Sequence, residues 1–232
     1  RSANAQTTPV RHPQGVYAFF LVALLANAQQ NANPSITPAE LHTYFKQLYS
    51  TALTNPAVSG LALGTPWNLL NPNPPSNPQP YDWSWLDDAF STVAAWNAQN
   101  PSKTPKTIQL AFSSGFNSPQ WVTDQIPSCN GLFMSPVQTP PSNCGSATFR
   151  GFVEGGGGVL PLPWNTFYQT SLETFVRALA ARYGANPALV SVDITGPTAA
   201  STEMIMPDNN TSGAQTQFGL PIQPNAMWLK LL

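Results

Sequence analysis

Residues 57–65 read AVSGLALGT, a short apolar run that predicts a buried β-strand. Similar runs, KTIQLAFS and ALVSVDIT, occupy residues 106–113 and 188–195. Residues 15–25 start with a further apolar run, and we expect a strand there as well. Because the apolar side chains in these runs are mostly continuous rather than alternating, we expect the strands to form a parallel sheet.

Helical patterns separate the predicted strands. Each begins with a short polar side chain that can accept hydrogen bonds from the first N–H groups of a helix. In the third predicted helix, Glu173 and Arg177 have the i,i+4 spacing of an ion pair, and Gly184 is placed to be the C-cap. The predicted caps are Thr37, Asp82 and Asn165. The helices that follow them are expected to end before Asn55, near residue 97 and at Tyr183, respectively. A fourth helix is expected over residues 225–232.

This alternation of strands and helices predicts an α/β fold of the parallel (β/α)8 TIM-barrel type. The segments after the strands lengthen along the chain, up to an irregular segment at about residues 114–163, and such segments build the active site of these barrels. Eight βα units need about 250 residues. Since four units use the 232 residues here, we expect residues 1–14 to be an arm and residues 15–232 to be half of a barrel, a fragment of a longer sequence.

Charged side chains are scarce, with 9 Lys+Arg, 10 Asp+Glu and a net charge of −1. They make up 8% of the chain, whereas an ordinary soluble domain has about 25%. Binding to nucleic acid or to an anionic membrane surface needs many cations, so neither is expected. The hydrophobic content of 42% is enough for a core. Uncharged Asn, Gln, Ser and Thr supply the polarity, which is typical of an exported protein with neutral ligands such as sugars.

Cys129 and Cys144 are the two cysteines of the chain and lie in a Pro/Ser/Gly-rich stretch. We expect them to form a disulfide, worth about 3 kcal/mol in the chain-entropy model; the alternative is two buried thiols. A disulfide indicates an oxidising compartment, so we expect a secreted or periplasmic protein. Residues 16–28 are also similar to a signal peptide, but the order of elements favours a strand, and the run is too short to span a membrane.

Several motifs resemble the first half of retaining (β/α)8 glycoside hydrolases, in particular their bacterial β-galactosidase-like members. The segments WNLLNP (67–72) and YDWSWLD (81–87) are similar to the second βα unit of those enzymes. The third and fourth units are matched by AFSSGFNSPQW (111–121), PWN (163–165) and TGPTAASTEM (195–204). The resemblance implies two carboxylates about 5–5.5 Å apart, an acid/base just beyond strand four and a nucleophile at strand seven.

Glu203 is the only glutamate after the fourth predicted strand, so the resemblance implies that it is the acid/base. Its apolar neighbours Met204, Ile205 and Met206 favour the protonated carboxyl group that a general acid needs. Those families have Asn directly before this glutamate, whereas Thr202 stands here, and an exposed loop glutamate is the alternative.

Asp193 lies inside the predicted fourth strand, where a charged group is costly unless it is paired. It either points toward the substrate and Glu203 or belongs to a structural ion pair. Glu154 in the long irregular segment is a weaker candidate. The strand-seven nucleophile is expected beyond residue 232, so we expect the chain alone to be an inactive fragment.

Aromatic rings on active-site segments commonly stack on sugars, and amides hydrogen-bond to them, although packing is an equally good role for each tryptophan. No metal site or cofactor is expected, because His12 and His42 are far apart and neither a dinucleotide motif nor a P-loop is present. The candidate sugar-binding residues are Trp67, Asn68, Asn117, Trp121, Trp164 and Asn165.

We therefore expect a retaining glycosidase that acts on a neutral carbohydrate. The alternative is a non-catalytic exported domain that binds carbohydrate or another surface, and a third reading is a structural exported domain without a ligand.

Overall fold

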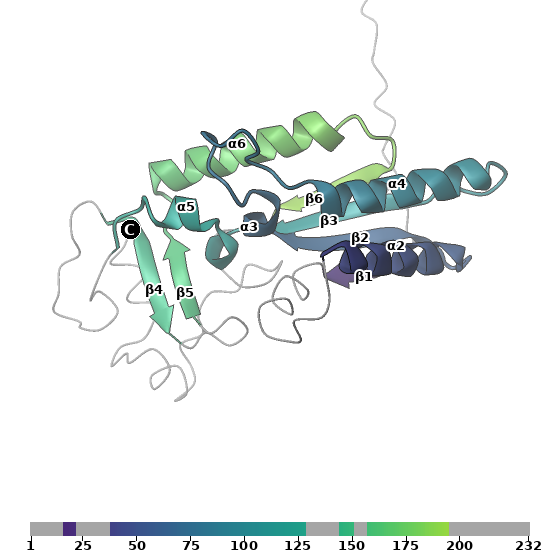
Figure 1. Ribbon diagram of the computed structural model, residues 1–232, viewed down its shortest axis with the longest axis horizontal. Helices are drawn as coiled ribbons and strands as arrows, with labels where there is room; N and C mark the ends of the chain where they lie inside the picture. The colour runs from purple at the N-terminus through teal and green to yellow at the C-terminus, as the bar shows by residue number, and fades with distance from the viewer. Residues whose placement is uncertain (1–15, 22–37, 129–143, 151–156, 195–232) are drawn as a thin grey trace, which may run out of the picture.

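The computed structural model describes residues 16–21, 38–128, 144–150 and 157–194 (Figure 1). Its main sheet has four strands, all parallel, in the order β1-β2-β3-β6. These strands are β1 (Val16–Leu21), β2 (Val58–Pro66), β3 (Thr107–Ser113) and β6 (Leu189–Ile194). The parallel sheet predicted from the apolar runs is therefore confirmed, and its strands are neighbours in the order in which the chain makes them.

Three long helices pack against one face of this sheet: α2 (Pro38–Thr54), α4 (Ser84–Gln99) and α6 (Thr166–Tyr183). Alternate residues of β2 and β3 point toward these helices. Among them, Leu63, Leu110 and Phe112 have almost no exposed surface. The ring of Phe112 meets that of Phe175 on α6 edge to face, with 5.3 Å between the ring centroids. The buried core is thus the layer between the sheet and these helices.

The opposite face of the sheet is different. On β2, β3 and β6 it carries small or polar side chains, and no helix of the described residues packs on it. Ser191 and Asp193 of β6 are exposed on this face, and their partners on β3, Gln109 and Ala111, are half-buried. The side chains on this open face include Ala62, Gln109, Ala111, Ser191 and Asp193, which line a cavity of about 370 Å³.

The helix starts follow from local hydrogen bonds. The Asn165 side chain accepts a hydrogen bond from the Tyr168 N–H, so the predicted cap of α6 is confirmed. The Asp82 carboxylate accepts a hydrogen bond from the Ser84 N–H at 3.0 Å. The helix α4, however, begins at Ser84, so Trp83 and not the predicted Asp82 occupies the N-cap position. Gly184 ends α6 as predicted, but with ordinary right-handed backbone angles rather than the left-handed ones common at helix ends.

The segment predicted to be irregular, residues 114–163, contains regular structure. It forms a 3-10 turn η1 (Gly115–Asn117), the short helix α5 (Gln120–Thr123) and an antiparallel hairpin of β4 (Ser146–Arg150) and β5 (Gly157–Pro161). A one-turn helix, α3 (Trp67–Leu70), also occupies the start of the predicted loop after β2. Such short elements were missed because they have too few residues to show a hydrophobic period, and β5 begins with two glycines, which are poor strand formers.

The described residues form four strands of a sheet and do not test closure into a barrel. The predicted arm (1–14) and the predicted last helix (225–232) lie outside them. Among the described residues, no helix has both the length and the apolar character that a membrane crossing requires.

Candidate functional site at the strand ends

The four parallel strands point in the same direction, and the segments that follow them gather at their carboxyl ends (Figure 1). The segment after β2 is joined to the segment after β3 by a hydrogen bond from Trp121 Nε1 to the Asn71 carbonyl, 3.1 Å long. The β4–β5 hairpin joins the same edge through Gly145, whose N–H donates to the Pro127 carbonyl. Ligands of parallel α/β sheets bind at this edge, so it is the candidate site.

Trp67 is part of the core and not of the surface of this site. Its side chain has no exposed area, and its ring centroid lies 5.8 Å from Phe175 and 6.0 Å from Tyr168. Its indole Nε1 donates to the Asn71 side-chain oxygen over 3.2 Å. A ring covered on both faces cannot stack on a sugar, so the packing role is the one that the structure assigns to Trp67.

Asn71 was not singled out by the sequence, yet it holds the loop together. Besides accepting from Trp67, its amide Nδ2 donates to the carbonyls of Asn73 and Pro80, both at 2.9 Å. Its side chain is buried, so each of these bonds replaces a bond to water. The only sequence signal was the asparagine-rich context, which does not tell one asparagine from another. Its neighbour Asn68, a predicted sugar ligand, is exposed on α3.

The predicted ligands Asn117 and Asn165 both have structural partners. Asn117 Nδ2 donates to the Ser113 hydroxyl over 2.8 Å and remains half-buried. Asn165 caps α6, and its amide lies against the backbone of Gly145, where a Cβ atom would stand 2.1 Å from Asn165 Nδ2. These bonds leave Asn117 partly accessible at the strand ends and make Asn165 a positioning residue.

Trp121 and Trp164 remain at the surface of this edge. Trp121 is half-buried, with its ring centroid 6.4 Å from that of Phe167 in an edge-to-face arrangement. Trp164 is 38% exposed and Phe167 is 37% exposed, which is unusual for such large apolar side chains. Phe167 was missed because a single aromatic residue in a helical pattern predicts burial. Trp121 and Phe167 are in ring contact, and Trp164 stands three residues before Phe167 in the chain. We call these three residues the strand-end aromatic surface.

A buried tyrosine fixes the turn after β3 beneath this surface. Tyr168 Oη accepts a hydrogen bond from the Gly115 N–H at 3.3 Å, and burial raises the pKa of its phenol. Gly115 has a φ of 63°, a conformation that side chains with a Cβ rarely adopt. The phenol is therefore neutral at ordinary pH and acts as a fixed hydrogen-bonding group rather than as a base.

Asp193 is exposed on the open face of the sheet, one residue before the end of β6. Its neighbour across the strand pair is Ala111, and it lines the cavity of about 370 Å³ on that face. Within the described residues it forms no ion pair, so nothing there supports the alternative of a structural ion pair. The same cavity has no other carboxylate among its lining residues.

Other predicted site residues lie outside the described part of the chain. These residues include Glu203, Glu154 and Cys129. Cys144 lies within the described residues and carries no free thiol. The pairing of the two cysteines stays a prediction. In the described residues no group of three or more His, Cys, Asp or Glu side chains is arranged to hold a metal ion.

No family model matches the sequence, and no curated protein matches it. Among solved structures, the chain is similar to a β-galactosidase from the psychrophilic Marinomonas ef1, with 14% sequence identity and a TM-score of 0.43. The match covers 78% of this chain and 21% of the β-galactosidase, so the chain spans about one fifth of the length of that enzyme.

Proposed function

We propose that the chain is part of a retaining glycoside hydrolase and supplies four βα units of a (β/α)8 barrel. The observation that carries the proposal is the one-sided sheet. Its parallel strands lie in chain order with helices on a single face, whereas doubly wound sheets have helices on both faces. In a barrel the face without helices is the interior.

The strand-end edge supports carbohydrate as the substrate. The strand-end aromatic surface offers apolar ring faces beside half-exposed amides, which is the combination that binds the CH faces and hydroxyl groups of a sugar. Asp193 stands on the interior face, one residue from the strand end, where it can accept a hydrogen bond from a sugar hydroxyl or orient the acid/base.

In the proposed mechanism Glu203 is protonated and donates its proton to the glycosidic oxygen as the bond to the anomeric carbon breaks. A second carboxylate attacks that carbon from the other face and forms a glycosyl-enzyme intermediate. Glu203, now ionised, takes a proton from the water that releases the sugar. The second carboxylate is expected outside residues 1–232. Export to an oxidising compartment is part of the proposal and agrees with the low charge of the chain.

The test is hydrolysis of aryl glycosides by the full protein that contains this chain. Glu203→Gln is expected to lower kcat/KM for a phenyl glycoside by about 10²–10⁴-fold, because phenol leaves slowly without a proton donor. The loss is expected to be much smaller for a dinitrophenyl glycoside, whose leaving group needs no proton. Glu173→Gln, which changes an exposed ion pair on α6, is the matched control and should leave both rates unchanged.

Equal activity of Glu203→Gln and the parent protein on both substrates would remove Glu203 from the mechanism and make Asp193 or Glu154 the next candidate. The second candidate function is carbohydrate binding without catalysis, which the exposed Trp164 and Phe167 favour. It predicts retention on a neutral polysaccharide that Trp164→Ala weakens, with no hydrolysis of any glycoside.

A further inference from the structure

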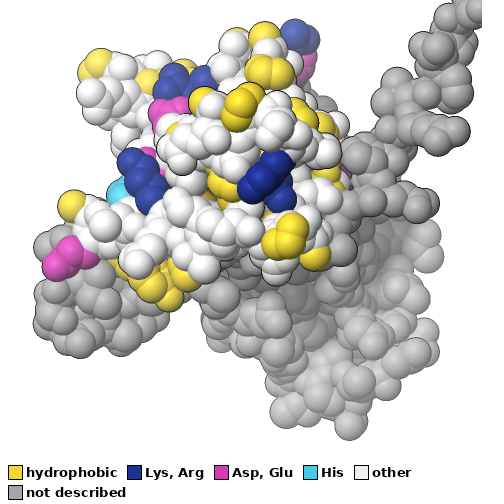
Figure 2. All heavy atoms as spheres, turned by 90° about the vertical axis from the view of Figure 1, so that its right-hand side faces the viewer, with side chains coloured by type: hydrophobic (Ala, Val, Ile, Leu, Met, Phe, Trp, Pro, Cys, Tyr) yellow, Lys and Arg dark blue, Asp and Glu magenta, His cyan; other side chains and the backbone are white. Residues whose placement is uncertain are grey.

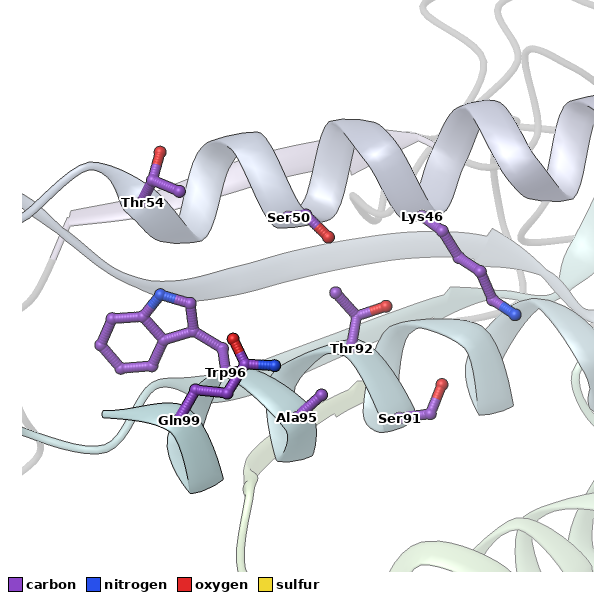
Figure 3. A pocket seen from close by; sticks show the side chains of 8 residues that line it. All are labelled: Lys46, Ser50, Thr54, Ser91, Thr92, Ala95, Trp96 and Gln99. Atoms are coloured by element: carbon purple, nitrogen blue, oxygen red, sulfur yellow. The ribbon is translucent and has the colours of Figure 1, made fainter. Parts of the chain in front are cut away.

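A groove runs between α2 and α4 on the outer surface of the helix layer (Figure 3). Its volume is about 520 Å³. Trp96 and Gln99 lie at one end, near the last residues of the two helices, and Lys46 lies toward the other. The core layer and the sheet separate this groove from the open face that carries Asp193, so it is a different site from the strand-end edge.

The hydroxyl groups of the groove are arranged as hydrogen-bond acceptors. Ser91 and Thr92 both donate to the Asp88 carbonyl, at 3.0 and 2.7 Å, and Thr54 donates to the Thr51 carbonyl at 2.6 Å. Since each hydrogen is already used inside its own helix, the oxygen lone pairs remain available. A ligand that satisfies these oxygens must bring its own donors.

Trp96 supplies an aromatic wall. In Figure 3 its indole ring is seen face-on beside the Gln99 amide. The ammonium of Lys106 lies 4.8 Å from the ring centroid, and that of Lys103 lies 5.6 Å from it. Lys106 also donates to the carbonyl of Asn55, which directly follows α2.

The charged side chain in the lining of the groove is paired. Lys46 is the charged side chain that lines it, and its Nζ lies 2.7 Å from an Asp88 carboxylate oxygen, whose other oxygen is 2.6 Å from His42 Nδ1. On the face in Figure 2, charged side chains are few and scattered among uncharged ones. The lining lysine is thus already paired, whereas the ammonium groups of Lys103 and Lys106 lie beside the Trp96 ring at the rim. An apolar helix would cover hydroxyl groups that it cannot satisfy.

We propose that this groove binds a neutral carbohydrate chain, with one sugar ring stacked on Trp96 and its hydroxyl groups donating to Thr54, Ser91 and Thr92. Sugar hydroxyls both donate and accept, so the same chain can satisfy the Gln99 amide. The site needs no carboxylate and lies away from the strand ends. It is thus independent of the proposed catalysis and would hold a polymer on the outer face of the protein.

The experiment is native gel electrophoresis of the full chain through gels that contain soluble β-glucan, soluble β-galactan or polygalacturonate. We expect retardation by at least one of the two neutral polymers and none by polygalacturonate. Trp96→Ala is expected to weaken the binding at least about fivefold, as is typical when a central aromatic anchor is removed. Ser91→Arg is the second variant, because Ser91 is exposed and a larger side chain there fills the groove without entering the core.

Glu173→Gln, at an exposed ion pair on α6, is the control and should bind as the parent does. Trp164→Ala is a separate arm that reports on the strand-end aromatic surface. Loss of retardation in Trp164→Ala but not in Trp96→Ala or Ser91→Arg would place binding at the strand ends and overturn the groove proposal, while leaving the proposed function intact. Unchanged binding in both groove variants, equal binding of polygalacturonate, or no binding of either neutral polymer would also overturn it. Thermal unfolding of each variant checks that it is folded.

Discussion

At the scale of single residues, burial separates structural tryptophans from accessible ones. Trp67 and Trp164 both stand on segments that follow the sheet, yet Trp67 has no exposed surface and Trp164 is 38% exposed. Asn71 explains part of this difference, because it satisfies the indole N–H groups of both Trp67 and Trp121, through its side chain and its carbonyl respectively. A buried indole needs such a partner, whereas an exposed one can use water.

Asn71→Ala is expected to lower the free energy of unfolding by about 2 to 3 kcal/mol, because it leaves the Trp67 N–H and two backbone carbonyls without their partner. Chemical denaturation followed by tryptophan fluorescence measures the change. The control is Asn68→Ala on the exposed side of α3, for which a change within about 0.5 kcal/mol is expected. Equal stability of the two variants would show that the network around Asn71 is unimportant.

At the scale of elements, α6 depends on its cap and on cross-helix bonds. Asn165 satisfies the Tyr168 N–H at its start. Near its end, Arg182 and Tyr183 both bond to Asp87 of α4, at 2.5 and 2.8 Å. The cap is a local feature and the bonds to α4 span more than 90 residues, so only the first was visible in the sequence.

Asn165→Ala is expected to destabilise the protein by about 1 kcal/mol through loss of this cap. Asn165→Asp keeps an acceptor at the same place and adds a negative charge at the start of the helix, which favours it. We therefore expect Asn165→Asp to lose less stability than Asn165→Ala in thermal unfolding. The opposite order would show that the contact of the Asn165 amide with Gly145 outweighs the cap.

At the scale of the whole molecule, buried tyrosines join the helix layer to the sheet and the strand-end segments. Burial raises the pKa of Tyr49, Tyr168 and Tyr183 above the ordinary value for a phenol. The negative charge of Asp88 raises the pKa of Tyr49 further, and Asp87 does the same for Tyr183. In the folded protein these groups keep their protons at a pH where the unfolded chain loses them. Lys106 acts in the other direction, because desolvation lowers its pKa.

Stability is therefore expected to fall as the pH rises above about 10, where the unfolded state binds fewer protons than the folded state. The contribution of these tyrosines is fully present below that pH. Urea unfolding at pH 8 and pH 11, with phenolate absorbance at 295 nm, checks both the loss and its source. Tyr49→Phe removes one such phenol and should make the pH dependence shallower. A stability that is flat between the two pH values would contradict the assignment.

The sequence by itself determined the order of the main strands and helices and the cap at Asn165. These features depend on residues within a few positions of one another, so local patterns predict them. The tertiary structure alone decided that Trp67 is core, that Asn71 is a central hydrogen-bonding residue and that Trp164 and Phe167 are exposed. The groove beside Trp96 was equally invisible, because it exists only where α2 and α4 meet. Burial and hydrogen bonding across such distances depend on which segments pack together, and no short stretch of sequence carries that information.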